Sequence, residues 1–293
     1  MGDLFLAIDA GGTAVKAAIF DATGRLVTAR AVDVVTIHRD NGWVEREPEA
    51  FWRNTARAIR ELTSGQIDPG RIAAIACTGF GNGIFLVDEQ GRGTRDGIVS
   101  VDHRAQSIVD DFRRDGTADA MEALSGHRIW GGQTIMQLIW LARNEPHVVE
   151  RTRWALACKD YIRMRLTDVA ASDPSDASGG GLLNLERGDY DAGYFERLGI
   201  GAFISRLPPL VENTGIAGCV SRSAAEETGL LAGTPVVAAM MDVSACVTGS
   251  GVIGGNLLTM IAGTWSINAI ETDRKVRENP PILNMLHRDR ACR

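Results

Sequence analysis

Two apolar runs, far apart in the chain, end in the same kind of glycine–threonine turn. Leu4–Ile8 leads into the turn Asp9–Thr13, and a second strand-like run follows at once over 14–21. Downstream, Leu257–Ala262 ends in Gly263-Thr264 and is followed by another strand-like run. Glycine lets backbone N–H groups approach an oxyanion closely, and threonine adds a hydroxyl donor. Both units are therefore predicted to be strand, phosphate-binding turn, strand.

Each turn also has a plainer explanation, a tight β-hairpin in which glycine only supplies a positive φ. Two observations favour phosphate: the turn is repeated, and the carboxylate of Asp9 ends the first strand. A carboxylate beside a phosphate needs a cation between them, and Mg²⁺ commonly binds through one or two carboxylates, waters and substrate phosphates. We therefore expect two facing turns that hold a nucleotide triphosphate, as in a phosphoryl-transfer enzyme.

The remaining periodicity predicts strands that alternate with helices. The expected strands are 4–9, 14–21, 26–32, 72–77, 83–88 and 235–239, and the expected helices are 48–62, 104–114, 134–144, 159–166, 224–230 and one that begins at Val243. Strands followed by a helix and a further strand form an α/β pattern. Gly179–Gly181 is expected to be a loop or a close backbone approach. No element is assigned to 273–293, which is basic and without clear periodicity.

Composition narrows the class of protein. The 293 residues are 45% hydrophobic and 23% charged, which is typical of a soluble globular protein with one large or two moderate domains. The formal net charge is −6, and the absence of a dense Lys/Arg stripe makes nucleic acid an unexpected ligand. The apolar runs have strand length, too short for a membrane span. Five scattered cysteines without a Cys-x-x-Cys pair favour reduced thiols and a cytoplasmic location.

Asp242 is the leading candidate for a catalytic base. It stands at the carboxyl end of an expected buried strand and at the start of a helix, where open α/β sheets bind their ligands. Transfer of phosphate to an alcohol needs a carboxylate that orients the hydroxyl and accepts its proton. A helix N-cap is the alternative role for this aspartate, and the two roles are compatible.

Two loops carry candidate ligands for a sugar. Asp102 and Arg104 place an acceptor and a donor fork within three residues, before an expected helix, where they could bind adjacent hydroxyls. An N-cap with a solvated arginine is the alternative there. Gly79–Gly83 follows a buried strand and offers the amide of Asn82 between glycines, and a plain turn is its competing explanation.

The joint order of these short motifs resembles the FGGY carbohydrate kinase family, from Leu4 to about Ile270. The motifs are Asp9–Thr13, Thr78–Gly83, Ser100–Arg104, Lys159–Ile162, Leu166–Asp168, Ser172–Ser178, Leu207–Leu210, Gly233–Val236 with Asp242, and Ala262–Ser266. The second and third are most similar to the branch acting on L-xylulose and related keto-sugars or polyols. The resemblance implies an α/β, actin-like (ribonuclease H-like) ATPase fold, with the sugar mainly on the first domain and ATP mainly on the second.

The resemblance also implies roles for individual residues. Asp242 matches the family's catalytic base, and Asp9 is placed to hold Mg²⁺ through water. The remaining matches are Asp9, Gly11, Gly12, Thr13 and Lys16 in the first phosphate-binding turn, Gly263 and Thr264 in the second, and Gly81, Asn82, Asp102, Arg104 and Asp242 at the sugar. Phe80 stands where many members carry glutamine, and Asn82 where xylulose kinases often carry histidine, so no particular sugar is assigned.

Members of the family continue well beyond residue 293. Residues 1–250 are therefore expected to form a complete N-terminal sugar-binding domain with the first phosphate-binding turn, and 251–293 the beginning of a truncated nucleotide-binding domain. The expected function is the ATP-dependent phosphorylation of a hydroxyl of a pentulose or related polyol, impaired by truncation. A catalytically silent sugar-binding module or a decayed kinase fragment are the alternatives. An apolar face exposed by truncation favours self-association, so a homo-oligomer is possible.

Overall fold

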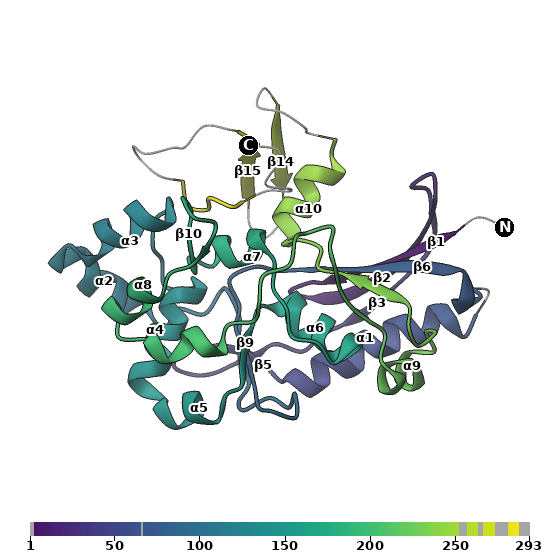
Figure 1. The fold of residues 1–293 in the computed structure, drawn as a ribbon, viewed down its shortest axis with the longest axis horizontal. Coiled ribbons are helices and arrows are strands. Elements are labelled where there is room, and N and C mark those ends of the chain that lie inside the picture. The colour runs from purple at the N-terminus through teal and green to yellow at the C-terminus, as the bar shows by residue number, and fades with distance from the viewer. Residues whose placement is uncertain (1–2, 66, 252–256, 263–265, 273–280, 287–293) are drawn as a thin grey trace.

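The computed structural model describes residues 3–65, 67–251, 257–262, 266–272 and 281–286. Its largest layer is a six-stranded sheet with the order β12-β13-β6-β1-β2-β3 (Figure 1). The strands are β1 (Leu4–Ala10), β2 (Ala14–Asp21), β3 (Leu26–Asp33), β6 (Ile72–Gly79), β12 (Ile216–Cys219) and β13 (Pro235–Val237). β6 runs parallel to both β1 and β13, and the other pairs are antiparallel. The segments that follow β1, β6 and β13 therefore meet at one edge of the sheet.

Alternating apolar positions attach this sheet to its covering helices. In β1 the side chains of Leu4, Leu6 and Ile8 are buried in one core, whereas those between them are less buried. Three helices complete this core: α1 (Pro48–Thr63), α6 (Cys158–Thr167) and α9 (Arg222–Thr228). α1 begins at a proline, whose fixed φ suits the first helical position.

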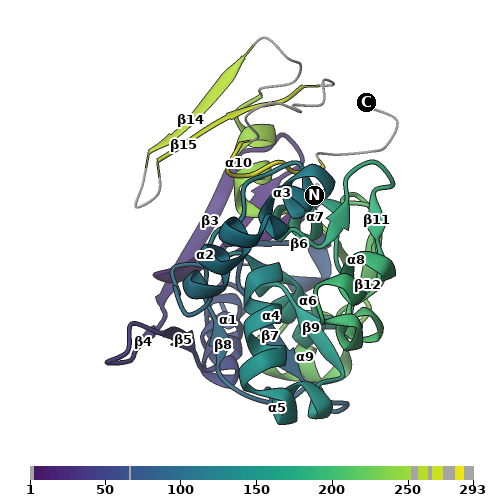
Figure 2. The same cartoon turned by 90° about the vertical axis from the view of Figure 1, so that its left-hand side faces the viewer.

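A second core lies among helices on one side of the molecule, where Figure 2 shows α2, α3, α4 and α5 together. Its helices are α2 (Gln106–Asp115), α3 (Thr117–Ser125), α4 (Thr134–Asn144), α5 (Pro146–Arg151) and α8 (Ala192–Arg197). The short elements are β4 (Ile37–His38), β5 (Val44–Arg46), β7 (Phe85–Val87), β8 (Gly97–Ile98), β9 (Trp154–Leu156), β10 (Leu183–Asn184), β11 (Asp189–Tyr190), α7 (Pro174–Gly179) and the 3₁₀ helices Pro69–Arg71 and Gly201–Arg206. The described part of the chain therefore has two large hydrophobic cores, one between the six-stranded sheet and its helices and one among helices α2, α3, α4, α5 and α8.

The chain then leaves this body through α10 (Asp242–Gly249) and enters a hairpin. The hairpin pairs β14 (Leu258–Ala262) with β15 (Ser266–Ile270) and stands beside α10 in both views (Figures 1 and 2). The two strands expected on either side of the second turn are therefore confirmed. The turn itself, with Gly263 and Thr264, lies outside the described residues.

Most expected elements are confirmed, and a few end at other residues for local reasons. α2 begins at Gln106, not Arg104, because the Asp102 carboxylate accepts the Arg104 N–H before the helix starts. β13 ends at Val237, because Ala239 has a φ of 57°, which is incompatible with a strand. The expected strand 83–88 shortens to β7. At its end the Asp88 carboxylate accepts two backbone N–H groups and forms a turn, and at its start Ile84 forms an isolated bridge with Ile98.

Residues 174–179 form a helix that the sequence pattern did not predict. The Asp173 carboxylate caps α7 by accepting the N–H groups of Ser175 and Asp176, and proline occupies the first helical position. Gly179 is the last residue of this helix, and Gly181 beyond it has a φ of 75°. The expected loop over Gly179–Gly181 is therefore confirmed only after Gly179.

Two further expectations concern thiols and membranes. Of the four cysteines described, Cys77 and Cys158 are buried and Cys219 and Cys246 are exposed, and all four are free thiols. In the part of the chain that the structure describes, no helix is long and apolar enough to cross a bilayer.

Candidate active site

The loops that follow β6 and β13 contact one another at the edge of the sheet. The Thr78 hydroxyl donates to the Met240 carbonyl at 2.8 Å. A Cβ added to Gly81 would lie 2.0 Å from the Met241 sulfur, so only glycine allows this close approach without displacing that side chain. The structure therefore places the predicted sugar-loop residue Gly81 against the segment that leads directly into Asp242.

The segment Ala238–Met241 is held by several elements at once. Arg163 Nη1 donates to the Ala238 carbonyl at 2.6 Å, and the Met241 N–H donates to the Ser175 hydroxyl at 3.0 Å. Between them Ala239 adopts a φ of 57°, a left-handed conformation that costs a non-glycine residue about 1–2 kcal/mol. This strain is maintained by the surrounding bonds, and it fixes the position from which Asp242 projects.

Asp242 is the first residue of α10 and is half-buried. Burial is the main cause that raises the pKa of Asp242 to about 6, and the negative charge of Asp9 raises it further. The hydrogen bond that the Asp242 carboxylate accepts from the Val243 N–H at 2.7 Å lowers it. The N-cap position of α10 is Met241, so Asp242 lies one residue inside the helix. The alternative N-cap role is therefore wrong for this aspartate.

Asp9 and Lys16 flank the first predicted phosphate-binding turn. The Lys16 ammonium lies 3.5 Å from the Asp9 carboxylate, and the two side chains are 63% and 38% exposed. A Cβ added to Gly12 would meet no atom within 4 Å, so open space adjoins the turn. The structure thus brings Asp9 close enough to Asp242 for their charges to interact, with an accessible turn beside them.

Asp102 and Arg104 bind one another in the interior. Asp102 is completely buried, and its carboxylate accepts the Val44 N–H at 2.6 Å and the Arg104 Nε at 2.9 Å. The Arg104 guanidinium lies 4.2 Å from the ring centroid of Trp43 and donates to Glu45 Oε1 at 2.9 Å. The alternative of an N-cap with a solvated arginine is therefore wrong. Their contact with a sugar stays a prediction.

Asn82 is also buried and adopts a φ of 58°. Its Oδ1 lies 3.5 Å from the Thr134 N–H, and the Gln137 amide donates to the carbonyls of Asn82 at 3.5 Å and Val99 at 3.3 Å. Gln137 therefore links the Gly81–Asn82 loop to the segment that precedes Asp102.

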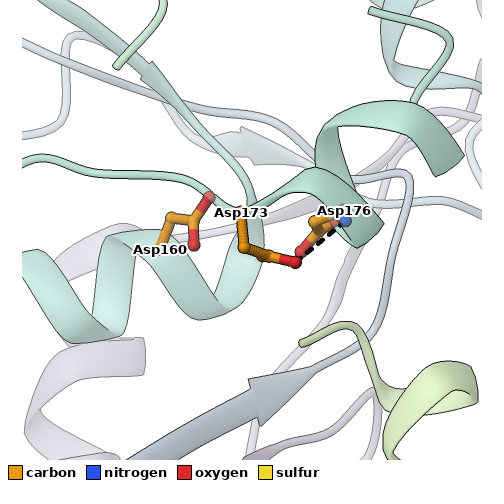
Figure 3. A group of neighbouring side chains, drawn as sticks. All are labelled: Asp160, Asp173 and Asp176. Carbon is orange, nitrogen blue, oxygen red and sulfur yellow. Dashed lines mark hydrogen bonds between the residues drawn. The ribbon is translucent and has the colours of Figure 1, made fainter. Parts of the chain in front are cut away.

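A set of charged side chains that sequence reasoning missed lies nearby; we call it the buried charge cluster. Its members are Lys159, Asp160, Arg163, Asp173 and Asp176. Figure 3 shows the three aspartates, whose carboxylates are close enough together to suit a metal ion. The Lys159 ammonium, however, contacts all three, at 2.5 Å from Asp160 and 3.6 Å from Asp176. A cation of the protein therefore already occupies the position that a metal would take.

The titration of the cluster follows from its burial. Burial opposes the charge of Asp160, but Lys159 and Arg163 outweigh it and hold the pKa below its usual range. Burial raises the pKa of Asp176 well above its usual value, and the negative charges of Asp160 and Asp173 act in the same direction, against the positive charge of Lys159. The sequence motifs Lys159–Ile162 and Ser172–Ser178 contain four of these five residues, but nothing local indicates that their charged side chains are buried together.

Comparison with known proteins agrees with this architecture. A family model described as the N-terminal domain of the FGGY family of carbohydrate kinases matches residues 4–249. The chain is 34% identical over 264 residues to a probable L-xylulose kinase from Pasteurella multocida (strain Pm70), covering 90% of this chain and 55% of that protein. It is 35% identical over 257 residues to an erythritol kinase from Brucella abortus (strain 2308), covering 87% and 49%. A crystal structure of a xyloylose kinase from Brucella ovis matches with a TM-score of 0.78 at 29% identity, covering 87% and 52%.

These matches define the class of protein. The described residues have the actin-like ATPase fold and cover its N-terminal domain, as the resemblance implied. The chain belongs to the FGGY family of carbohydrate kinases. It spans about half the length of the relatives that it matches.

Proposed function

We propose that this chain contributes the sugar-binding domain and the first phosphate-binding turn to an ATP-dependent carbohydrate kinase. The observation that carries the proposal is the Asp242 carboxyl, whose pKa of about 6 is near the pH at which a general base works best. The names of the relatives, L-xylulose kinase and erythritol kinase, support a pentulose or a related polyol as the acceptor.

In the proposed reaction, Asp242 orients the attacking hydroxyl and accepts its proton, and most of the rate comes from positioning and electrostatic stabilisation. Gly81, Asn82, Asp102 and Arg104 are the proposed sugar ligands. The proposed phosphate ligands are Asp9, Gly11, Gly12, Thr13 and Lys16, together with Gly263 and Thr264, which lie outside the described residues.

The first turn fits a nucleotide with Mg²⁺. The Asp9 side chain is 38% exposed, so it can reach a hydrated ion, and the space beside Gly12 is open. Bound Mg²⁺ would neutralise charge on the phosphates. Asp9 would hold the ion through water, and Lys16 would add positive charge at the same turn.

The domain boundary and the setting are parts of the same proposal. A boundary near residue 250 separates the sugar-binding domain (1–250) from the start of a nucleotide-binding domain (251–293), and the family match to 4–249 supports it. We propose a cytoplasmic enzyme whose partner is a small sugar or polyol. Whether the chain forms a homo-oligomer is a question for size-exclusion chromatography.

Calorimetric titration tests the proposal. The titrated compounds are L-xylulose, D-xylulose, erythritol and glycerol, each with and without Mg·ATP. They are added to the unsubstituted protein, to D242A and to the control variant D119A, which removes an exposed acidic residue from the first turn of α3. One compound should bind saturably, at least tenfold more weakly to D242A and equally to D119A, because Asp242 hydrogen-bonds the acceptor hydroxyl. Any phosphoryl transfer should fall at least 100-fold in D242A.

Three results would contradict the proposal or replace it. Equal sugar binding and transfer in D242A would remove Asp242 from the site. Silence toward every compound in a folded sample would favour a decayed fragment. Saturable binding with no transfer under any condition would favour a sugar-binding module without catalysis.

A further inference from the structure

Arg46 lies against the β1–β2 turn and binds its backbone at two oxygens. Nη1 donates to the Gly11 carbonyl at 3.1 Å, and Nη2 donates to the Gly12 carbonyl at 2.6 Å and to the Thr36 hydroxyl at 3.0 Å. The residue is only 2% exposed, and its guanidinium carbon lies 4.7 Å from the ring centroid of Phe51. Because a guanidinium is a rigid fork, it fixes both peptide units at once.

Because Arg46 binds the two carbonyl groups, it also determines where the N–H groups of the same two peptide units point. In a trans peptide the C=O and the N–H point in opposite directions, and no cis bond is present in the described chain. The Gly11 carbonyl shares its plane with the Gly12 N–H, and the Gly12 carbonyl with the Thr13 N–H. Both N–H groups therefore point away from Arg46. Among the described residues none accepts a hydrogen bond from either, and successive N–H groups on one side form an anion-binding concavity.

Arg46 has no carboxylate partner among the described residues, unlike two other deeply buried arginines. Arg104 pairs with Asp102 at 2.9 Å, and Arg163 pairs with Asp160 at 2.9 Å. Within the described ranges, Arg46 pairs with no carboxylate, and burial lowers its pKa. Burying an unpaired cation is unfavourable. An anion on the far side of the turn would supply the missing negative charge.

We propose that Arg46 is a positioning residue that turns the Gly12 and Thr13 N–H groups toward a phosphate and adds its positive field to the site. The proposal rests on the proposed function, which places the nucleotide phosphates at this turn. Arg46 itself does not touch the phosphate, because the turn lies between them. Its hydrogen bonds to the backbone act on the phosphate-binding turn, whereas its guanidinium carbon lies 5.3 Å from the ring centroid of Phe80 in the loop that follows β6, so the larger effect is expected on phosphate.

The test measures phosphate affinity directly. Mg²⁺ with inorganic tripolyphosphate, which carries the phosphates without adenosine, is titrated into the protein, R46Q, R46K and R165Q. Losing two oriented donors to an anion should weaken tripolyphosphate binding about tenfold in R46Q, and the sugar affinity should change less. R46K keeps the positive charge but lacks the guanidinium fork, so its affinity for tripolyphosphate should lie between those of R46Q and the unsubstituted protein. If R46Q does not fold, R46K is the variant that tests the proposal.

R165Q is the matched control. Arg165 is partly buried and donates to Glu49 at 2.6 Å and to the Tyr161 hydroxyl at 3.0 Å, and none of its bonds reaches the turn. It should bind tripolyphosphate as the unsubstituted protein does. Equal affinities in the protein, R46Q and R46K, or an equal loss in R165Q, would overturn the role of Arg46 alone. No tripolyphosphate binding by the unsubstituted protein would overturn the phosphate site of the proposed function, and this inference with it.

Discussion

The buried charge cluster and the site at Asp9 and Asp242 are both groups of carboxylates, but they differ in what surrounds them. The cluster encloses the ammonium of Lys159, which is inaccessible to solvent. At the other site Asp9 is 38% exposed and open space adjoins the turn at Gly12. Carboxylates that already hold an internal cation stabilise the fold, whereas carboxylates that remain accessible can bind and react.

The same physical cause has different consequences in the two regions. Burial raises the pKa of Asp176 well above its ordinary range, against the positive charge of Lys159 beside it. Burial raises the pKa of Asp242 only to about 6, so it is mostly ionised at neutral pH. A carboxylate of this kind can accept a proton, which the proposed reaction requires.

Removing the internal cation should have the largest effect. Lys159→Met should lower the free energy of unfolding by about 3–5 kcal/mol, because it leaves buried carboxylates without their partner. Urea denaturation measures the change. Lys16→Met is the control at the other site: its side chain is 63% exposed, and the expected change is within about 0.5 kcal/mol. Similar losses in the two variants would remove the distinction between the regions.

Neutralising Asp242 should stabilise the protein in a pH-dependent way. Its pKa in the folded protein is about 6 against 3.8 as the ordinary value, so ionisation destabilises the fold progressively as pH rises from about 4 to 6. Asp242→Asn removes this loss. The variant should be more stable by up to about 3 kcal/mol at pH 7.5, from a shift of about two pKa units, and equal near pH 3.5. Thermal unfolding across pH measures this.

Asp119→Asn provides the control for that series, because Asp119 is exposed on α3. It should show no comparable difference between the two pH values. A D242N variant that is less stable than the unsubstituted protein at pH 7.5 would mean that the carboxylate is a structural partner, like those of the buried charge cluster.

A smaller effect is expected where the two regions join. Arg163, a member of the cluster, holds the Ala238 carbonyl, and Ala239 after it is strained at a φ of 57°. Ala239→Gly should raise the free energy of unfolding by up to about 1 kcal/mol, since glycine adopts this conformation without strain. Ala238→Gly, at a buried position without positive φ, should lower it by about 1 kcal/mol. Destabilisation by both changes would show that Ala239 is not strained.

Local pattern was sufficient for much of the fold. The alternation in β1 and β2, the proline at the start of α1 and the strand-to-helix transition at Asp242 all depend on neighbouring residues, and all three predictions are confirmed. Local pattern was not sufficient to predict the surroundings of the site residues. Asp102 and Arg104 were considered as sugar ligands or as a cap with a solvated arginine, and the structure shows them paired in the interior.

The sequence by itself determined the strands β1, β2, β3 and β6, most of the longer helices, the β1–β2 turn with its glycines, and the family, because each of these depends on short runs of residues and their order. Only the tertiary structure decided which charges became internal. Lys159 and Lys16 each form an ion pair with an aspartate, but Lys159 is inaccessible to solvent and Lys16 is 63% exposed. Arg46 gives no local sign that it binds the turn 34 residues before it. Burial and partner choice depend on contacts between distant segments, so they are determined only when the chain has folded.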